Sequence, residues 1–281
     1  MMVRLAVIAA MLSVFAGTAL ADAQLDRGAY LVTGVMNCGN CHSPKGPPAM
    51  VAGKDFSGGL SWDVPPFAVT ASNITQDKET GIGAWTDADI KKLLRTGMRP
   101  NGTPLAAIMP VGFYGIITDS DMDAIVAYLR TIKPVSNTVP APVYRMRTKS
   151  GVFPGTEQPY TQAALDDPLK RGFYLASIGH CMECHTPETK TGGHDFTNDA
   201  GRGGFEFPGP WGVSVSRNIT SSKTKGIGDW SNTDIKHAIT QGIDKDGNKL
   251  KPPMGYGYYA KMTDADLDAV VVWLRTVPPK E

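Results

Sequence analysis

The chain has 281 residues, with 28 lysines and arginines against 27 aspartates and glutamates, a formal net charge of +1. A neutral chain without a basic run offers no electrostatic footprint for DNA or RNA, so a nucleic-acid partner is disfavoured. Beyond the first 21 residues, no stretch stays apolar for the ~18–20 residues that a membrane-spanning helix needs. We therefore expect a mature chain with no transmembrane segment.

Residues 1–21 have the pattern of a secretory signal peptide. Arg4 is followed by an unbroken run of apolar and small residues that ends in Ala19-Leu20-Ala21, an A-x-A sequence. This pattern predicts export and cleavage after Ala21; an uncleaved membrane helix is the alternative. Export would place the protein in the periplasm, where a partner could hold it peripherally at the membrane.

The chain then presents three segments with helical patterns. The first, LDRGAYLVTG (residues 25–34), directly precedes the motif CGNCH. The second, over 86–97, begins with Thr86 as an N-cap and a capping-box aspartate three residues later, and it ends at a glycine. The third, over 118–132, has apolar residues at i, i+3, i+4 and i+7, which is the spacing of one helix face.

The second half of the chain repeats the first. The motif Cys38-Gly-Asn-Cys41-His42 returns as Cys181-Met-Glu-Cys184-His185. Downstream pairs share one constant offset of 145 residues: Asn73 and Asn218, Trp85 and Trp230, Met109 and Met254, Arg130 and Arg275. A constant offset indicates an internal duplication, with about a hundred residues in each unit.

We therefore divide the chain into four parts. Residues 1–21 form the signal peptide, 22–132 the first domain, 133–168 a proline-rich linker and 169–281 the second domain. No segment shows a convincing alternation of apolar and polar residues. The predicted fold class is thus all-α, with two tandem bundles of about three to five helices.

The repeated cysteine motif has four interpretations, and all four cysteines of the chain lie in its two copies. A structural zinc site requires two further nitrogen or sulfur ligands per motif, or one site built from both motifs. A thioredoxin-like redox pair requires a βαβ context that the pattern lacks. A disulfide over two intervening residues stabilises little, because so short a loop closes easily in the unfolded chain. None of these accounts for a histidine directly after the second cysteine, twice.

Haem attachment accounts for the histidine. In C-x-x-C-H, both thiols form thioether bonds to the haem, and the adjacent imidazole is the fifth ligand of the iron. The motif thus predicts two covalently bound haem c groups. Cys38 and Cys41 would hold the first and Cys181 and Cys184 the second, with the following residues, His42 and His185, as iron ligands.

Nearly all of the mature sequence resembles class I-type c-type cytochromes. The run NITQDKETGIGAWTDADIKKLLRTGMRPNG, followed by IMP, resembles more narrowly the cytochrome c subunits that accept electrons from periplasmic and membrane-associated alcohol and gluconate dehydrogenases. This resemblance implies two tandem cytochrome c-like domains, each wrapped around one haem. It also implies that the carbonyls of Pro44 and Pro187 accept the N–H of the ligating imidazoles.

A sixth ligand decides whether such a haem carries electrons or performs chemistry. Met109 and Met254 occupy equivalent positions in the loops AAIMPVG and KPPMGYG, and the resemblance implies that both ligate iron. His/Met ligation is the cytochrome c pattern and raises the potential. Met98 is a weaker candidate, because its counterpart in the second unit is Ile243.

Two functions follow from these alternatives. With both haems closed, the protein is a carrier that takes electrons from a periplasmic dehydrogenase and delivers them to a downstream respiratory acceptor. With one open or switchable haem, it is a dihaem enzyme, such as a peroxidase or a sulfur-compound dehydrogenase. The symmetric methionines favour the carrier. The repeated pairs Trp85/Trp230 and Asn73/Asn218 are either haem-propionate donors or ordinary structural residues.

Overall fold

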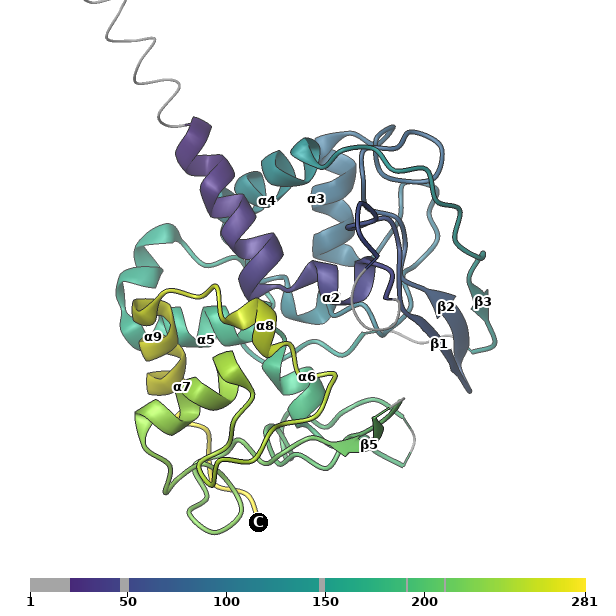
Figure 1. Ribbon diagram of the computed structural model, residues 1–281. Coiled ribbons are helices and arrows are strands. Elements are labelled where there is room, and N and C mark those ends of the chain that lie inside the picture. Colours follow the sequence, from purple (N-terminus) through teal and green to yellow (C-terminus); the bar gives the residue numbers. More distant parts are fainter. Residues whose placement is uncertain (1–20, 46–50, 147–149, 191, 210) are drawn as a thin grey trace, which may run out of the picture.

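The computed structural model describes residues 21–45, 51–146, 150–190, 192–209 and 211–281. Residues 1–20, which include almost all of the predicted signal peptide, lie outside this range. The described part begins with helical residues 21–30, which continue into the π-helix η1 (Leu31–Val35). In Figure 1 this purple segment runs into the middle of the molecule, between the two groups of helices. The predicted helix over 25–34 is thus confirmed.

The helices follow the same order in both units. The first unit contains α2 (Cys38–His42), α3 (Asp87–Thr96), η2 (Val111–Phe113) and α4 (Asp119–Thr131). The second contains α5 (Pro168–Ile178), α6 (Cys181–His185), α7 (Asn232–Gln241), α8 (Tyr256–Tyr259) and α9 (Asp264–Leu274), preceded by η3 (Gln162–Asp166). Five-residue helices therefore carry both cysteine motifs.

The helix starts are built by local capping. The Thr86 hydroxyl accepts a hydrogen bond from the Asp89 backbone N–H, and the Asp89 carboxylate accepts one from the Thr86 N–H, which together form a capping box. Ser231 and Asp234 form the same box before α7. Gly97 ends α3 in the left-handed conformation. The predicted helices over 86–97 and 118–132 are confirmed.

Two small antiparallel sheets accompany the helices, so the prediction of an all-α fold holds only for the helical scaffold. β1 (Ser61–Val64) pairs with β2 (Phe67–Thr70), and β2 also pairs with β3 (Val143–Tyr144). In the second unit β4 (Glu206–Gly209) pairs with β5 (Gly212–Val215). These strands are only two to four residues long, and β1, β3 and β5 are mostly exposed while β2 is partly buried, so none carries a clear alternating pattern.

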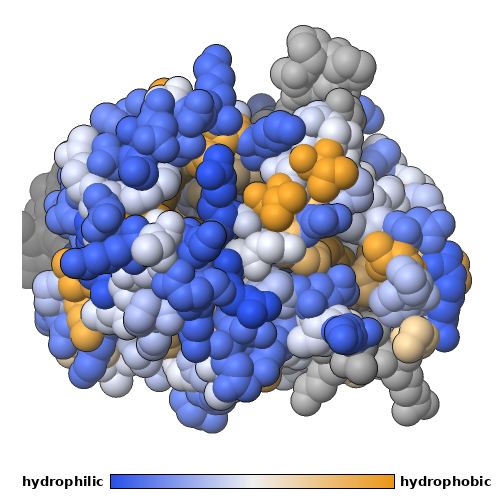
Figure 2. Space-filling view, turned by 90° about the horizontal axis from the view of Figure 1, so that it is seen from below, coloured by the Kyte–Doolittle hydropathy of each residue, from blue (hydrophilic) through white to orange (hydrophobic). Residues whose placement is uncertain are grey.

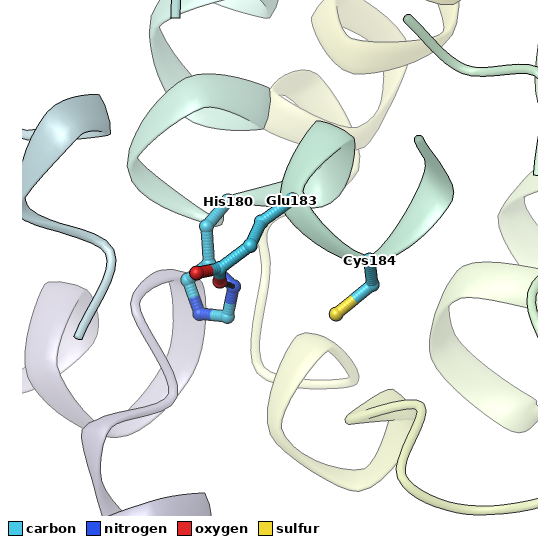
Figure 3. A group of neighbouring side chains, drawn as sticks. All are labelled: His180, Glu183 and Cys184. Carbon is cyan, nitrogen blue, oxygen red and sulfur yellow. Dashed lines mark ion pairs between the residues drawn. The ribbon is translucent and has the colours of Figure 1, made fainter. Parts of the chain in front are cut away.

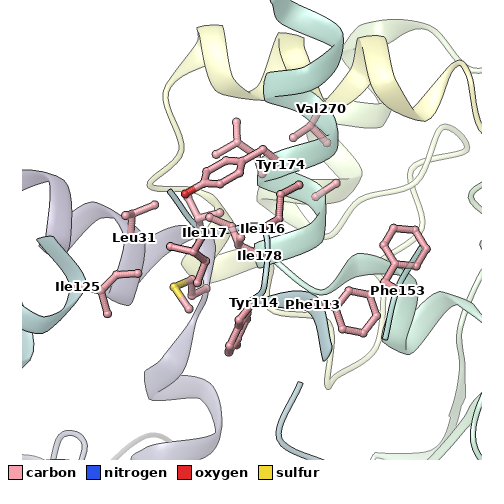
Figure 4. Packing of buried hydrophobic residues seen from close by; sticks show 14 of the residues in the cluster. Leu31, Phe113, Tyr114, Ile116, Ile117, Ile125, Phe153, Tyr174, Ile178 and Val270 are labelled. Carbon is pink, nitrogen blue, oxygen red and sulfur yellow. The ribbon is translucent and has the colours of Figure 1, made fainter. Parts of the chain in front are cut away.

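One hydrophobic cluster joins the two units. Leu31, Ile116 and Ile117 from the first unit and Tyr174 and Ile178 from the second are all fully buried in it. Figure 4 shows these side chains meeting between the helices of the two halves. The units therefore share a core, because each alone is small for burying the apolar faces of its helices.

The predicted linker contributes to that core. Within residues 133–168, Phe153, Thr156 and Leu165 are buried, and Phe153 stacks on Phe113 with ring centroids 5.2 Å apart. The same segment supplies β3 to the sheet of the first unit. The proline-rich stretch is therefore packed against the units that it connects.

The first and last helices of each unit cross at a glycine. A Cβ atom at Gly28 would lie 2.0 Å from the Ala124 carbonyl oxygen, and one at Gly172 would lie 1.9 Å from that of Ala269. Only glycine permits this close approach of the two backbones. The glycine follows an arginine in both copies, Arg27 and Arg171.

A buried aspartate at the interface accepts hydrogen bonds from both units. Arg27 donates from Nε and Nη2 to the two carboxylate oxygens of Asp121, at 2.8 and 2.7 Å. Tyr174, from the other unit, donates its hydroxyl to the same carboxylate at 2.6 Å. The side chain of Asp121 is only 2% exposed, so these bonds replace the water it loses.

The second unit repeats the arrangement with the roles exchanged. Arg171 donates to Asp266 at 2.5 Å, and Tyr30 of the first unit donates its hydroxyl to Asp266. Each unit thus contains its own arginine–aspartate pair and contributes a tyrosine whose hydroxyl donates to the aspartate of the other unit. This reciprocity gives the interface an approximate two-fold symmetry.

On the face seen from below in Figure 2, hydrophilic residues predominate and the hydrophobic residues form small separate patches. Among the described residues, no helix combines the length and hydrophobicity required to cross a membrane.

Candidate haem-binding sites

The two cysteine motifs begin with the same uncommon backbone conformation. Asn37 and His180, which directly precede the first cysteine of each motif, have φ angles of 41° and 45°. This left-handed conformation is uncommon outside glycine, but asparagine and histidine adopt it more readily than most residues. It starts α2 and α6 abruptly, so both cysteines and the histidine lie within little more than one helical turn.

None of the four cysteines pairs with another in a disulfide, so both motifs keep two sulfurs for other bonds. Burial raises the pKa of Cys38 and Cys181 to about 12 and that of Cys41 to about 11. Paired neutral thiols with a neighbouring imidazole fit thioether attachment of a haem.

The histidines are oriented through one ring nitrogen. Nδ1 of His42 lies 2.7 Å from the Ser72 carbonyl oxygen, and Nδ1 of His185 lies 2.7 Å from that of Arg217. A backbone carbonyl at Nδ1 fixes the tautomer that leaves Nε2 available to a metal. Burial lowers the pKa of both imidazoles, which favours the neutral form that ligates iron.

The predicted role of the proline carbonyls is wrong. The carbonyls that face the imidazoles belong to Ser72 and Arg217, from the segments that follow the hairpins. The Pro187 carbonyl instead lies 3.3 Å from Nδ1 of His194. The partner of the ring is thus set by tertiary packing of a loop about thirty residues downstream.

The two methionines lie in equivalent loops. Met109 directly precedes the short turn into η2 and packs, partly buried, against the hydrophobic cluster. Met254 directly precedes the N-cap of α8. Each lies in a loop between the third and fourth conserved helical segments of its unit, as the repeat requires.

The paired asparagines have structural roles. The Asn73 amide donates to the Val135 carbonyl at 2.8 Å and its oxygen accepts from the Thr75 N–H. Asn218 makes the same contacts with Lys280 and Thr220. Both ends of each amide are therefore occupied within the loop, which favours the structural interpretation over a haem-propionate contact.

The first motif also contacts the second unit. The Asn37 amide donates to the Tyr259 hydroxyl at 2.8 Å, and that hydroxyl donates to the Gly179 carbonyl at 3.0 Å. The Asn40 amide lies 3.5 Å from the Pro253 carbonyl, directly before Met254. The attachment helix of one unit thus touches the methionine loop of the other. Sequence reasoning missed this contact, because no local pattern marks residues that pair across more than two hundred positions.

The second motif adds a charged group. Nδ1 of His180 lies 3.3 Å from a Glu183 carboxylate oxygen, and these atoms and the Cys184 sulfur all lie within 4.8 Å of one another. Figure 3 shows the Glu183 carboxylate against the His180 ring, with the sulfur of the next residue, Cys184, to one side of this pair. Thioether formation would occupy that sulfur, so the cluster belongs to the haem attachment and does not form a separate metal site.

Comparisons with known proteins agree with this chemistry. The family model for cytochrome c matches residues 25–133 and again 169–278. The chain is 32% identical over 241 residues to the gluconate 2-dehydrogenase cytochrome c subunit of Pantoea cypripedii, covering 79% of this chain and 52% of that protein. It is 31% identical over 296 residues to the alcohol dehydrogenase (quinone) cytochrome c subunit of Gluconacetobacter polyoxogenes, covering 96% and 61%.

A shorter relative matches over most of both lengths. A protein described as diheme cytochrome c-type, from Cereibacter sphaeroides, is 29% identical over 260 residues, which cover 87% of this chain and 83% of that protein. By contrast, the chain spans only about half to three-fifths of the two dehydrogenase subunits. Two matched cytochrome c regions and a dihaem relative mean that the chain carries two covalently bound haem c groups.

Proposed function

The chain belongs to the cytochrome c family, and from this premise we propose that it is an exported dihaem electron carrier. It receives electrons from a dehydrogenase and passes them to a downstream respiratory acceptor. Support for the donor comes from the relatives, which are named as cytochrome c subunits of gluconate and alcohol dehydrogenases. Support for export comes from the signal-peptide pattern of residues 1–21. These features together favour the periplasm.

Each unit would hold its haem with four side chains. Cys38 and Cys41 would attach the first group, with iron between His42 and Met109. The second unit repeats the set as Cys181, Cys184, His185 and Met254. The bound iron supplies one-electron chemistry, while the chain supplies ligands, burial and fixed dipoles that set its potential. We assign these ligands to domains at 22–132 and 169–281, joined by 133–168.

The observation that carries the proposal is the symmetry of the two sites. Both ligating histidines have Nδ1 held at 2.7 Å by a main-chain carbonyl, and both units offer a methionine at the equivalent loop position. Because both axial positions would be filled by protein, neither iron would bind a substrate. Such haems exchange electrons only.

Carbon monoxide distinguishes this carrier from a dihaem enzyme. It binds reduced haem iron with an open position and leaves a closed His/Met haem unchanged. We expect the absorption spectrum of the dithionite-reduced holoprotein to be unaffected by carbon monoxide. A spectral change equivalent to one haem would contradict the carrier and would direct the search to peroxide and reduced sulfur compounds as substrates.

A further inference from the structure

The two attachment helices differ in charge at equivalent positions. The offset of 143 residues that relates the motifs places Asn40 opposite Glu183 and Lys45 opposite Glu188. The first helix is thus followed by a cation, whereas the second carries an anion within its motif. The arginine–aspartate–tyrosine contacts of the interface are the same in both units, so they do not distinguish the two haem attachments.

Glu183 lies close to the attachment point of the second haem. Its side chain is only 19% exposed, and its carboxylate belongs to the group of atoms within 4.8 Å that includes the Cys184 sulfur (Figure 3). This mostly buried charge therefore lies beside the second haem.

Lys45 has the opposite effect on the first unit. Its Nζ donates to the Asn40 side-chain oxygen at 2.8 Å, which holds the ammonium against α2. The carboxylate that occupies the Lys45 position in the second unit, Glu188, is exposed. At this position the first unit thus carries a cation and the second an anion.

A nearby negative charge stabilises oxidised iron and lowers the haem potential, whereas a positive charge stabilises reduced iron and raises it. The effect is larger for Glu183, because bulk water and salt screen a mostly buried charge less than an exposed one.

We propose that Glu183 and Lys45 set the haem of the second unit at a lower potential than the haem of the first, so that an electron passes internally from the second unit to the first. This inference rests on the proposed electron-carrier function. It adds a direction of internal flow that the near-identical ligand sets do not supply. The contact of Asn40 in α2 with Pro253, directly before Met254, brings the two units together where that transfer would occur.

A redox titration of the holoprotein, followed by haem absorption, tests the direction. The two potentials are assigned with Met254→His, which changes a ligand of the second haem only and should displace only its potential. In the unchanged protein, we expect the lower potential to belong to the second unit. Glu183→Gln should raise that potential most and should reduce the electron-sharing equilibrium constant between the haems by about tenfold, equivalent to ~59 mV.

Two matched variants complete the test. Glu206→Gln removes an exposed carboxylate from β4 and should leave both potentials unchanged. Lys45→Gln should lower the potential of the first haem, by less than the Glu183 effect because Lys45 is exposed. It also tests the same potential difference should Glu183→Gln fail to fold. The inference is overturned if the lower potential belongs to the haem of the first unit. It is also overturned if neither Glu183→Gln nor Lys45→Gln reduces the difference between the two haem potentials more than Glu206→Gln does. Carbon monoxide binding tests the carrier function separately, so either proposal can fail alone.

Discussion

The two units share a scaffold and differ at their haem attachments. Each has a glycine where its first and last helices cross. Each also has a buried aspartate that accepts hydrogen bonds from the arginine of its own unit and from a tyrosine of the other unit. At the attachment helices, however, the repeat differs: Asn37 and Asn40 of the first unit correspond to His180 and Glu183 of the second. The residues that hold the units together have kept their chemistry, while those beside the haems have diverged.

The sheets differ as well. The hairpin of the first unit gains β3 from the connecting segment, with Phe67 opposite Tyr144 and Ala68 opposite Val143. The equivalent hairpin of the second unit has two strands in the described chain. The two copies have thus kept the elements on which both units depend. Differences are concentrated where one unit can change without disturbing the other.

The largest effect expected in the scaffold is the loss of a shared aspartate. Asp121→Ala or Asp266→Ala would leave a partly buried guanidinium and a buried tyrosine hydroxyl without their acceptor. Each should lower the free energy of unfolding by about 3–5 kcal/mol, measured by urea denaturation of the holoprotein. Equal losses would confirm the reciprocal interface, and a loss in only one unit would contradict it. Asp119→Ala is the control, because that carboxylate is 93% exposed and should matter by less than ~0.5 kcal/mol.

Removing the hydroxyl of Tyr30 or Tyr174 should lower the free energy of unfolding less than removing an aspartate. Tyr30→Phe and Tyr174→Phe each remove one hydrogen bond to a charged acceptor but leave the arginine–aspartate pair in place. Each should lower the free energy of unfolding by about 1.5–3 kcal/mol. Tyr144→Phe, at an exposed tyrosine of β3 whose hydroxyl donates to the neutral Pro104 carbonyl at 2.8 Å, is the comparison and should cost less. If Tyr30→Phe and Tyr174→Phe lower the free energy of unfolding by unequal amounts, the two-fold symmetry of the interface does not extend to its energetics.

The same tyrosines predict a loss of stability at alkaline pH. Burial, together with the neighbouring aspartate, raises the pKa of Tyr30 and Tyr174 in the folded protein above the ordinary value of 10. Their contribution is therefore complete below pH 10 and declines as the pH rises above it, because the unfolded chain then releases protons that the folded chain retains. Each tyrosine should add a slope of about 1.4 kcal/mol per pH unit. Urea unfolding between pH 8 and 11 should show a shallower decline in the double Tyr→Phe variant, and an unchanged slope would contradict this assignment.

The smallest effect concerns the helix caps. Thr86→Ala and Ser231→Ala each remove one capping box from equivalent helices, α3 and α7. Each should reduce the free energy of unfolding by about 1 kcal/mol, again measured in urea. A much larger effect at one position would indicate that its helix depends on the cap more than its partner does.

Local chemistry explains which features could be predicted from the sequence. The helix starts at Thr86 and Ser231 were predictable, because a cap and its aspartate lie three residues apart. The hairpins were not, because short exposed strands carry no burial pattern. The tyrosine–aspartate bonds join residues 53 and 236 positions apart, and nothing in one sequence marks such pairs.

The candidate sites show the same division. The spacing within C-x-x-C-H indicates the attachment chemistry, because three side chains on one helical turn suffice to state it. The carbonyl that orients the histidine was assigned to Pro44 and lies instead on Ser72, in a loop whose position depends on the hairpin before it. The difference between Asn40 and Glu183 was visible in the sequence, but its meaning required the position of the Glu183 carboxylate beside the Cys184 sulfur.

The absorption spectrum of the oxidised holoprotein tests the central claim most directly. The long-wavelength iron–methionine charge-transfer band should have an intensity corresponding to two haems, and it should fall by half in Met109→Ala and by half in Met254→Ala. That result would establish two closed His/Met haems and an electron carrier. A band of one-haem intensity, lost entirely in one variant and unchanged in the other, would contradict the account and would indicate that one haem is open or has a different ligand.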